Sequence, residues 1–242
     1  HPYAHMALGT EESLRQLSIE TVRQFHSWLY CPSNATLMAS GDLTPGDFRQ
    51  MAADMFGAWT DSGTHTLKDA ALSPPPLAPV HRLVLVNKAG AAQSEIRIGE
   101  VGLSRSTPDY HPLIVLNMVL GGQFVSRINM KLRQERGLTY GARTAFDFRR
   151  GRGPFILQTS VQSDGTAEAI STSLLEIHAI RTDRQPTTDE VEIAKAALTR
   201  GYSRNFETAE QIARAMAQLV LYGLRDDYFD TFTSKVSDVT VD

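Results

Sequence analysis

The stretch LGGQFVSRINMKLRQERGLTY, residues 120–140, decides the fold. A mostly apolar segment over 108–120 predicts a buried helix, which the adjacent glycine pair ends. Apolar residues at helical spacing predict a second helix over 124–135, and Gly137 stops it. The following β-branched and aromatic residues predict a strand over 138–148. The stretch therefore predicts a helix, a turn and the start of a strand.

The segments on both sides extend this pattern into an α+β fold. Thr44, Pro45 and Asp47 form a helix start in which threonine caps the helix, proline begins it and aspartate completes a capping-box-like pair. The order of elements predicts a mostly antiparallel sheet covered by helices on one face. Besides those above, we expect helices over 11–30, with Ser18 as a possible second cap, and over 166–181, 188–204, 207–222 and 226–237, and strands over 34–40, 81–87, 94–103 and 154–162.

A proline-rich segment divides the chain. Residues 73–79 read SPPPLAP, which can neither continue a helix nor pair as a central strand. We expect an extended linker there, between a first domain over 1–72 and a second over 80–242. The segment 1–72 is expected to lack sheet partners.

Composition excludes several classes of protein. The 242 residues are 42% hydrophobic and 21% charged, with a net charge of −3, which is unlike a disordered chain or a general nucleic-acid binder. No apolar run approaches the ~18 residues that a membrane-spanning helix needs. The single cysteine, Cys31, allows no intrachain disulfide and is expected to be a buried or half-buried structural residue; the alternative is a reactive thiol. The chain begins at His1 without a signal-peptide pattern, so we expect a piece of a longer protein.

No histidine lies in a pattern typical of a metal site. The His-Glu-x-x-His and His-x-x-Glu-His arrangements, which place two ligands on one helix face, are absent from the sequence. Glu176 and His178 are close in sequence, and we interpret them as surface residues of a helix. The seven histidines are His1, His5, His26, His65, His81, His111 and His178.

Arg133 and Tyr140 are the candidate functional residues. Arg133 falls in the last predicted helical turn and Tyr140 near the start of the next strand, so a guanidinium and a phenol can converge on one acceptor oxygen. Such donors suit a peptide carbonyl that gains negative charge during hydrolysis. The alternative is structural: Arg133 pairs with Glu135 or another neighbour, and Tyr140 fills the sheet edge. The glycine pair Gly121-Gly122 favours turn and packing roles.

Three separated blocks resemble the pitrilysin-like (insulinase family) zinc metallopeptidases. The stretch 120–140 resembles the signature of that family's C-terminal half. The other blocks resemble the end of its N-terminal half and its closing helices, and they are HPY at 1–3, LGTEESL at 8–14, NATL at 34–37 with Gly41-Asp42, and YGL at 222–224 with Asp227-Tyr228.

The resemblance implies that zinc binding and substrate binding belong to different halves of the enzyme. The family has two homologous α+β halves that enclose a peptide, and zinc is held in the N-terminal half by His-x-x-Glu-His and a distant glutamate. None of those residues is present, so the resemblance implies zinc only in the complete enzyme or on a partner subunit, and no catalytic residue in this chain. It implies that Arg133 and Tyr140, seven positions apart, bind the carbonyl of the peptide substrate.

The resemblance also suggests which chain of a pair this is. The sequences of residues 1–13 and 222–224 are more like those of the subunit type that lacks the zinc motif. Such a subunit would form a heterodimer with a homologous zinc-bearing subunit. A periplasmic or membrane-associated location is implied. The alternative is a non-catalytic structural or peptide-binding subunit of the same fold. The Arg149–Arg152 cluster is expected to be a solvated hairpin tip.

Overall fold

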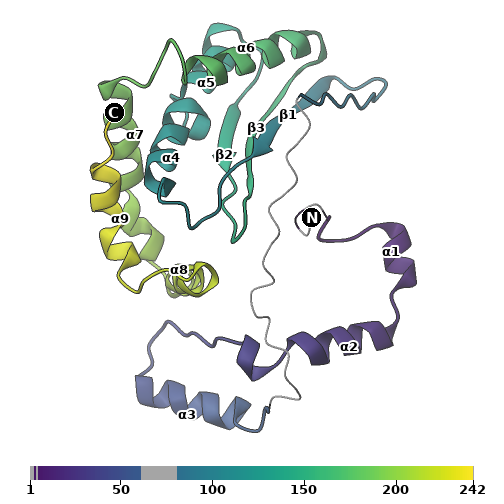
Figure 1. Cartoon of the computed structure of the whole chain (residues 1–242), viewed down its shortest axis with the longest axis vertical. Helices are drawn as coiled ribbons and strands as arrows, with labels where there is room; N and C mark the ends of the chain where they lie inside the picture. The colour runs from purple at the N-terminus through teal and green to yellow at the C-terminus, as the bar shows by residue number, and fades with distance from the viewer. Residues whose placement is uncertain (1–2, 4, 61–80, 242) are drawn as a thin grey trace. The chain divides into compact units, whose positions relative to one another are not determined.

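The computed structural model describes residues 3, 5–60 and 81–241 (Figure 1). The chain forms two compact units, each of which is described by itself. The first consists of His1–Pro74 and Asn205–Leu224, and the second of Pro75–Arg204 and Arg225–Asp242. The predicted linker 73–79 lies outside the described residues, so the domain limits 1–72 and 80–242 stay a prediction.

The second unit contains a three-stranded antiparallel sheet. Its strands are β1 (Gln93–Val101), β2 (Ala142–Phe146) and β3 (Pro154–Gln162), in the order β1-β3-β2. Every second residue of the central strand β3 is buried, which is the alternation expected of a sheet covered on one face. These buried residues are Phe155, Leu157, Thr159 and Val161.

The covering helices come from the stretch 120–140 and its surroundings. They confirm the predicted α+β fold with helices on one face of the sheet. Val115, Ile128 and Leu132 are almost fully buried in the core of this layer. The segments that contact the sheet are α4 (Tyr110–Asn117), the π-helical turn η3 (Met118–Gly122), α5 (Arg127–Asn129) and α6 (Thr166–Ala179). The π-helical segment η4 (Met130–Glu135) follows α5 and packs against α6.

One helical segment among the described residues, Tyr110–Glu135, is long and apolar enough by composition to cross a membrane. Its backbone is interrupted, because Gln123 and Ser126 are extended, with ψ of 170° and 155°. A bilayer offers no hydrogen-bond partners at such a break. Parts of the segment also contact β2. We therefore interpret it as a core element of the second unit.

The second unit is completed by short and long helices around this layer. The helices α7 and α9 contact each other and α4. Arg105 is 7% exposed and its guanidinium carbon lies 3.6 Å from the ring centroid of Tyr110, so a cation–π contact helps to hold the charge in the core. The remaining elements are η5 (Ser163–Gly165), α7 (Thr188–Thr199), η6 (Tyr202–Phe206), which runs across the limit between the units, and α9 (Tyr228–Ser237).

The first unit is helical in its described residues. Ser18 caps α2, since its side chain accepts a hydrogen bond from the backbone N–H of Thr21. Thr44 and Asp47 form the predicted capping box at the start of α3. The elements are α1 (Glu11–Gln16), α2 (Ile19–Leu29), η2 (Pro32–Asn34), α3 (Pro45–Phe56) and α8 (Ala209–Tyr222).

Two predicted strands are wrong. Residues 34–40 and 81–87 form no strand in the structure. A strand needs a hydrogen-bonded neighbour, and the described residues offer none to either segment. In the second segment Leu83, Val84, Leu85 and Val86 are at least 63% exposed, so the apolar run is not buried as a strand pattern implies.

Candidate functional site

The candidate site is built on the turn that joins η4 to β2. Gly137 adopts the left-handed conformation, with φ of +62°, which a residue with a side chain rarely takes. The next amide, of Leu138, donates back to the carbonyl of Leu132 at 2.9 Å. This closed turn follows the end of the helix at Glu135, two residues after Arg133, and directs the chain toward Tyr140.

Buried Asn129 links the loop before α5 to the start of β2. Its Nδ2 donates to the carbonyl of Phe124 at 2.6 Å, and its Oδ1 accepts from the N–H of Ala142, the first residue of β2, at 3.0 Å. One amide thus ties the loop after the glycine pair to the start of the strand. This role of Asn129 was not predicted from the sequence, although an asparagine among apolar helical residues is a signal for it.

Thr139, the residue before Tyr140, is hydrogen-bonded to the central strand of the sheet. Its hydroxyl lies 2.7 Å from the carbonyl oxygen of Ser160 on β3, and it accepts from the hydroxyl of Thr159 at 3.0 Å. It also accepts from the N–H of Gly141 at 3.1 Å. The backbone on each side of Tyr140 is therefore anchored, whereas the side chain is not.

The structural reading of Arg133 as a partner of Glu135 is not what the structure shows. Glu135 instead pairs with Lys131 at 2.6 Å. The guanidinium carbon of Arg133 lies 4.2 Å from the ring centroid of Phe124. Among the described residues, Arg133 has no carboxylate partner, so its hydrogen-bond donors are available to a ligand.

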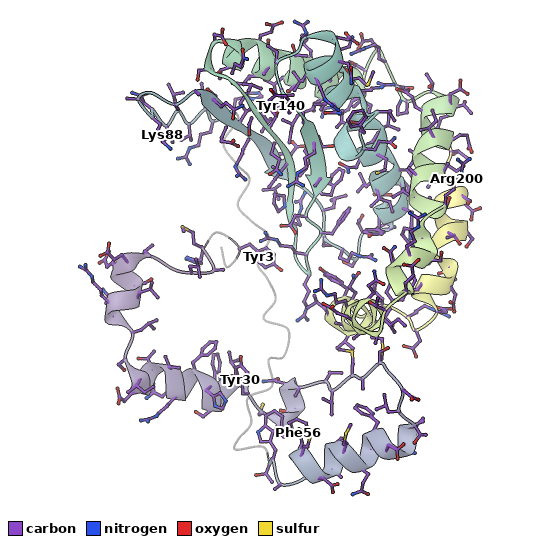
Figure 2. The ribbon with its side chains drawn as sticks, turned by 180° about the vertical axis from the view of Figure 1, so that it is seen from behind. Tyr3, Tyr30, Phe56, Lys88, Tyr140 and Arg200 are labelled. Atoms are coloured by element: carbon purple, nitrogen blue, oxygen red, sulfur yellow. The ribbon has the colours of Figure 1, made fainter. Side chains whose placement is uncertain are left out.

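Tyr140 does not fill the sheet edge. Its side chain is 93% exposed, the highest value among the large apolar residues of the described part (Figure 2). Within that part no hydrogen bond joins Tyr140 to Arg133. The two side chains therefore come from one helix–turn–strand segment, and no hydrogen bond joins them.

The glycine pair has the predicted packing role. A Cβ on Gly121 would lie 2.5 Å from Oγ1 of Thr144, and one on Gly122 would lie 2.6 Å from Nδ2 of Asn117. Both distances are shorter than real side chains allow. Thr144 and Asn117 are themselves joined, because the threonine hydroxyl donates to Oδ1 of the asparagine at 2.8 Å. The glycines let η3 approach β2 closely.

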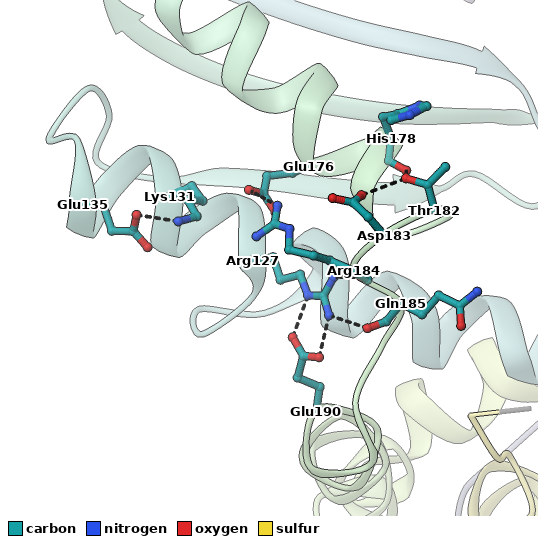
Figure 3. A network of polar contacts seen from close by, with 10 residues as sticks. All are labelled: Arg127, Lys131, Glu135, Glu176, His178, Thr182, Asp183, Arg184, Gln185 and Glu190. Atoms are coloured by element: carbon teal, nitrogen blue, oxygen red, sulfur yellow. Dashed lines mark hydrogen bonds and ion pairs between the residues drawn. The ribbon is translucent and has the colours of Figure 1, made fainter.

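Ion pairs join α5 to α7, and α6 to the segment that follows it (Figure 3). Arg127 forms a bidentate pair with Glu190, with both N–O distances at 2.6 Å, and it donates to the carbonyl oxygens of Arg184 and Gln185. The hydrogen bonds from Arg127, followed by those from Thr187, lower the pKa of Glu190 to about 2. Arg127 is thus a structural residue although it lies in the signature stretch.

Glu176 is buried, which corrects its interpretation as a surface residue. Its side chain is 5% exposed and accepts from Nη2 of Arg184 at 2.7 Å. The partner follows eight residues later, after the helix has ended, so the helical pattern alone gives no sign of the pair. A buried carboxylate needs such a partner, because desolvating it alone is costly.

A pocket of about 340 Å³ lies beside this network. Its cations are already matched, since Lys131 pairs with Glu135, Arg136 with Glu168 and Arg184 with Glu176. Each of these lining cations thus already has a carboxylate partner, so the pocket offers no unpaired cation to an anionic ligand. Its lining residues are Lys131, Arg136, Thr172, Leu175, Glu176, His178, Ala179, Asp183 and Arg184.

The described residues do not fit a metal centre. Among them, no group of three or more His, Cys, Asp or Glu side chains could hold a metal ion. Cys31 is 4% exposed, in agreement with a buried structural residue, and its sulfur lies 3.2 Å from the hydroxyl of Ser33. The zinc implied by the sequence resemblance has no ligand set in the part of the chain that is described.

These features define a metallopeptidase-like α+β domain without a metal site of its own among the described residues. The model of the family described as "Peptidase M16 inactive domain" matches residues 16–198. The chain therefore belongs to this family, and the resemblance found in the sequence is confirmed.

Several similar proteins are named as zinc proteases. The chain is 29% identical over 140 residues to the uncharacterized zinc protease YmxG of Bacillus subtilis, covering 58% of this chain and 32% of that protein. It is 23% identical over 252 residues to the uncharacterized zinc protease Rv2782c of Mycobacterium tuberculosis, covering 100% of this chain and 55% of that one. The chain thus spans a third to about half of these relatives.

Solved structures share the fold. A peptidase M16 inactive domain from Pseudomonas fluorescens matches with a TM-score of 0.82 and 24% identity, over 100% of this chain and 56% of that one. A protease from Helicobacter pylori matches with a TM-score of 0.85 and 18% identity, over 100% of this chain and 58% of that one. At these identities the likeness concerns the fold.

Proposed function

We propose that this domain binds the backbone of peptide substrates for a zinc-dependent endopeptidase. In this proposal Arg133 and Tyr140 donate hydrogen bonds to the oxygen of the scissile carbonyl. The zinc and its ligands belong to another part of a longer protein or to a homologous partner subunit. A periplasmic or membrane-associated heterodimer is part of the same proposal.

The proposal rests on two hydrogen-bond donors that lie on either side of one turn and have no carboxylate partner among the described residues. Arg133 has no carboxylate partner among the described residues, and the phenol of Tyr140 is exposed while the backbone around it is fixed by Asn129 and Thr139. Donors that project from a fixed backbone need less reorganisation when charge develops on the carbonyl oxygen than donors on an unanchored backbone. The anchoring thus serves a carbonyl-binding role better than a purely structural one.

The chemistry of the two donors is complementary. A guanidinium stays charged at all relevant pH values and can approach an oxygen with a planar fork of N–H groups. A neutral phenol adds a directed O–H donor. Phe124 supports the guanidinium of Arg133 from one side, which leaves its in-plane donors free. Both donors gain strength as the carbonyl oxygen becomes negative, so they favour the transition state over the bound substrate.

The test is turnover of a peptide by the complete enzyme or by the complex with a zinc-bearing partner. We expect Arg133→Ala and Tyr140→Phe each to lower kcat/KM about tenfold to a thousandfold, which is the scale for one lost oxyanion donor. Arg136→Ala is the matched control, because Arg136 lies three residues away and is already paired with Glu168. Unchanged turnover in both variants would instead favour the non-catalytic structural or peptide-binding subunit.

A further inference from the structure

The face of the sheet opposite its helices carries an ordered row of polar side chains. The strand register places Arg97 of β1 and Arg143 of β2 on either side of Gln158 of β3. Arg97 and Arg143 are exposed, and both lie on the face that alternates with the buried residues. Two guanidinium groups therefore flank one central amide across three strands.

The charge of this row is not neutralised within the described residues. With its amide oxygen turned toward β2, Gln158 accepts from Nε and Nη2 of Arg143, which orients the guanidinium but leaves its charge. Neither Arg97 nor Arg143 forms an ion pair in the described part of the chain. The row thus presents two positive charges and a spare guanidinium edge to solvent.

The rows on either side differ in character. On one side the register aligns Gly99, Ile156 and Ala145, which make an apolar row. On the other side it aligns Glu95 with Ser160, whose hydroxyl donates to the Glu95 carboxylate. The face therefore changes along the strands from apolar, through positive, to negative.

We propose that this face selects peptides by an acidic side chain placed over Arg97 and Arg143. The proposal rests on the proposed function, which makes the ligand a peptide. In an extended peptide, residues i and i+2 on one face are about 6.6–6.8 Å apart, the same spacing as successive rows of the sheet. An acidic residue over the arginine row then has a small apolar residue two positions to one side and a basic residue, opposite Glu95, two positions to the other.

Peptide binding by the 242-residue chain tests this without any cleavage step. The probes are two fluorescent, unstructured decapeptides of basic–x–acidic–x–alanine pattern that differ only in a central Glu or Gln, measured by anisotropy at low salt. We expect the Glu peptide to bind about threefold to tenfold more tightly, as exposed arginine–carboxylate pairs allow, and 0.5 M salt to abolish the difference. The double variant R97Q/R143Q should bind both peptides equally.

The control is R200Q, because Arg200 is an exposed arginine of the same unit that lies on α7 at its C-terminal end (Figure 2). It should keep the wild-type preference, and circular dichroism should show all variants folded. Equal binding of both probes by the wild type, an unchanged preference in R97Q/R143Q, or no binding of either probe overturns the proposal. The proposed function is judged separately, by turnover in the Arg133 and Tyr140 variants.

Discussion

Replacing Glu190 by glutamine removes the negative charge opposite Arg127 but keeps an oxygen that can accept hydrogen bonds. The side chains of this pair are 14% and 31% exposed, so solvent screens the pair only in part. Glu190 also accepts from the backbone N–H of Thr187 and completes the capping box of α7. The substitution therefore separates the contribution of charge from that of the cap.

The pKa of Glu190 sets the size of the expected loss in the free energy of unfolding. The folded chain lowers it from the ordinary 4.5 to about 2, which corresponds to about 3 kcal/mol of stability at neutral pH. Partial exposure reduces this, so we expect Glu190→Gln to cost about 1.5–3 kcal/mol. Because the folded pKa is the lower one, the contribution is complete above pH 4.5 and is lost as the pH falls toward 2. At pH 3.5 about 60% of it remains.

Urea unfolding of both proteins at pH 7 and pH 3.5, followed by circular dichroism, measures the difference. Glu210→Gln is the matched control, because Glu210 pairs with Arg214 on an exposed helix face and should cost less than about 0.5 kcal/mol. A cost for Glu190→Gln that is below 0.5 kcal/mol at pH 7, or that grows as the pH falls, would refute the assignment of this pair as a stabilising contact.

Three further outcomes follow from the same structure. Gly121→Ala should destabilise the second unit by about 1–3 kcal/mol in urea unfolding, because its Cβ would lie 2.5 Å from Thr144. Asn129→Leu should cost about 2–4 kcal/mol and should also lower peptide turnover, since it leaves two backbone groups unpaired beside the site. Burial lowers the pKa of His111, so its contribution to stability is present above pH 6.5 and is lost on acidification. Thermal unfolding at pH 7.5 and 5.5 should therefore show a larger fall in Tm for the wild type than for His111→Phe.

Local signals in the sequence predicted the helices well. The start of α3 depends on Thr44, Pro45 and Asp47, which lie within four residues of one another, so the sequence carries the whole cap. The restart at Ser18 is local in the same way. The glycine pair was also predictable, because a close approach between a helix and a strand leaves few other choices.

The failures concern contacts between distant residues. The segments 34–40 and 81–87 have strand-like composition, but a strand forms only where a neighbour pairs with it. The burial of Glu176 depends on Arg184 beyond the end of its helix, and the role of Asn129 depends on Ala142 thirteen residues later. Periodicity shows which face of an element is apolar, but it does not show which polar side chain a distant backbone group will need.

The anchoring of the candidate site explains why its two donors need not touch. Arg133 is positioned by the ring of Phe124, whose carbonyl Asn129 holds, and Tyr140 is positioned through Thr139 and the start of β2, which Asn129 also holds. A direct hydrogen bond between the two side chains would have to be broken before either could bind a carbonyl oxygen, at a cost in free energy. Fixing each donor through the backbone avoids that cost. The proposed carbonyl-binding role is therefore compatible with two donors that share no hydrogen bond, because each is positioned by its own backbone contacts.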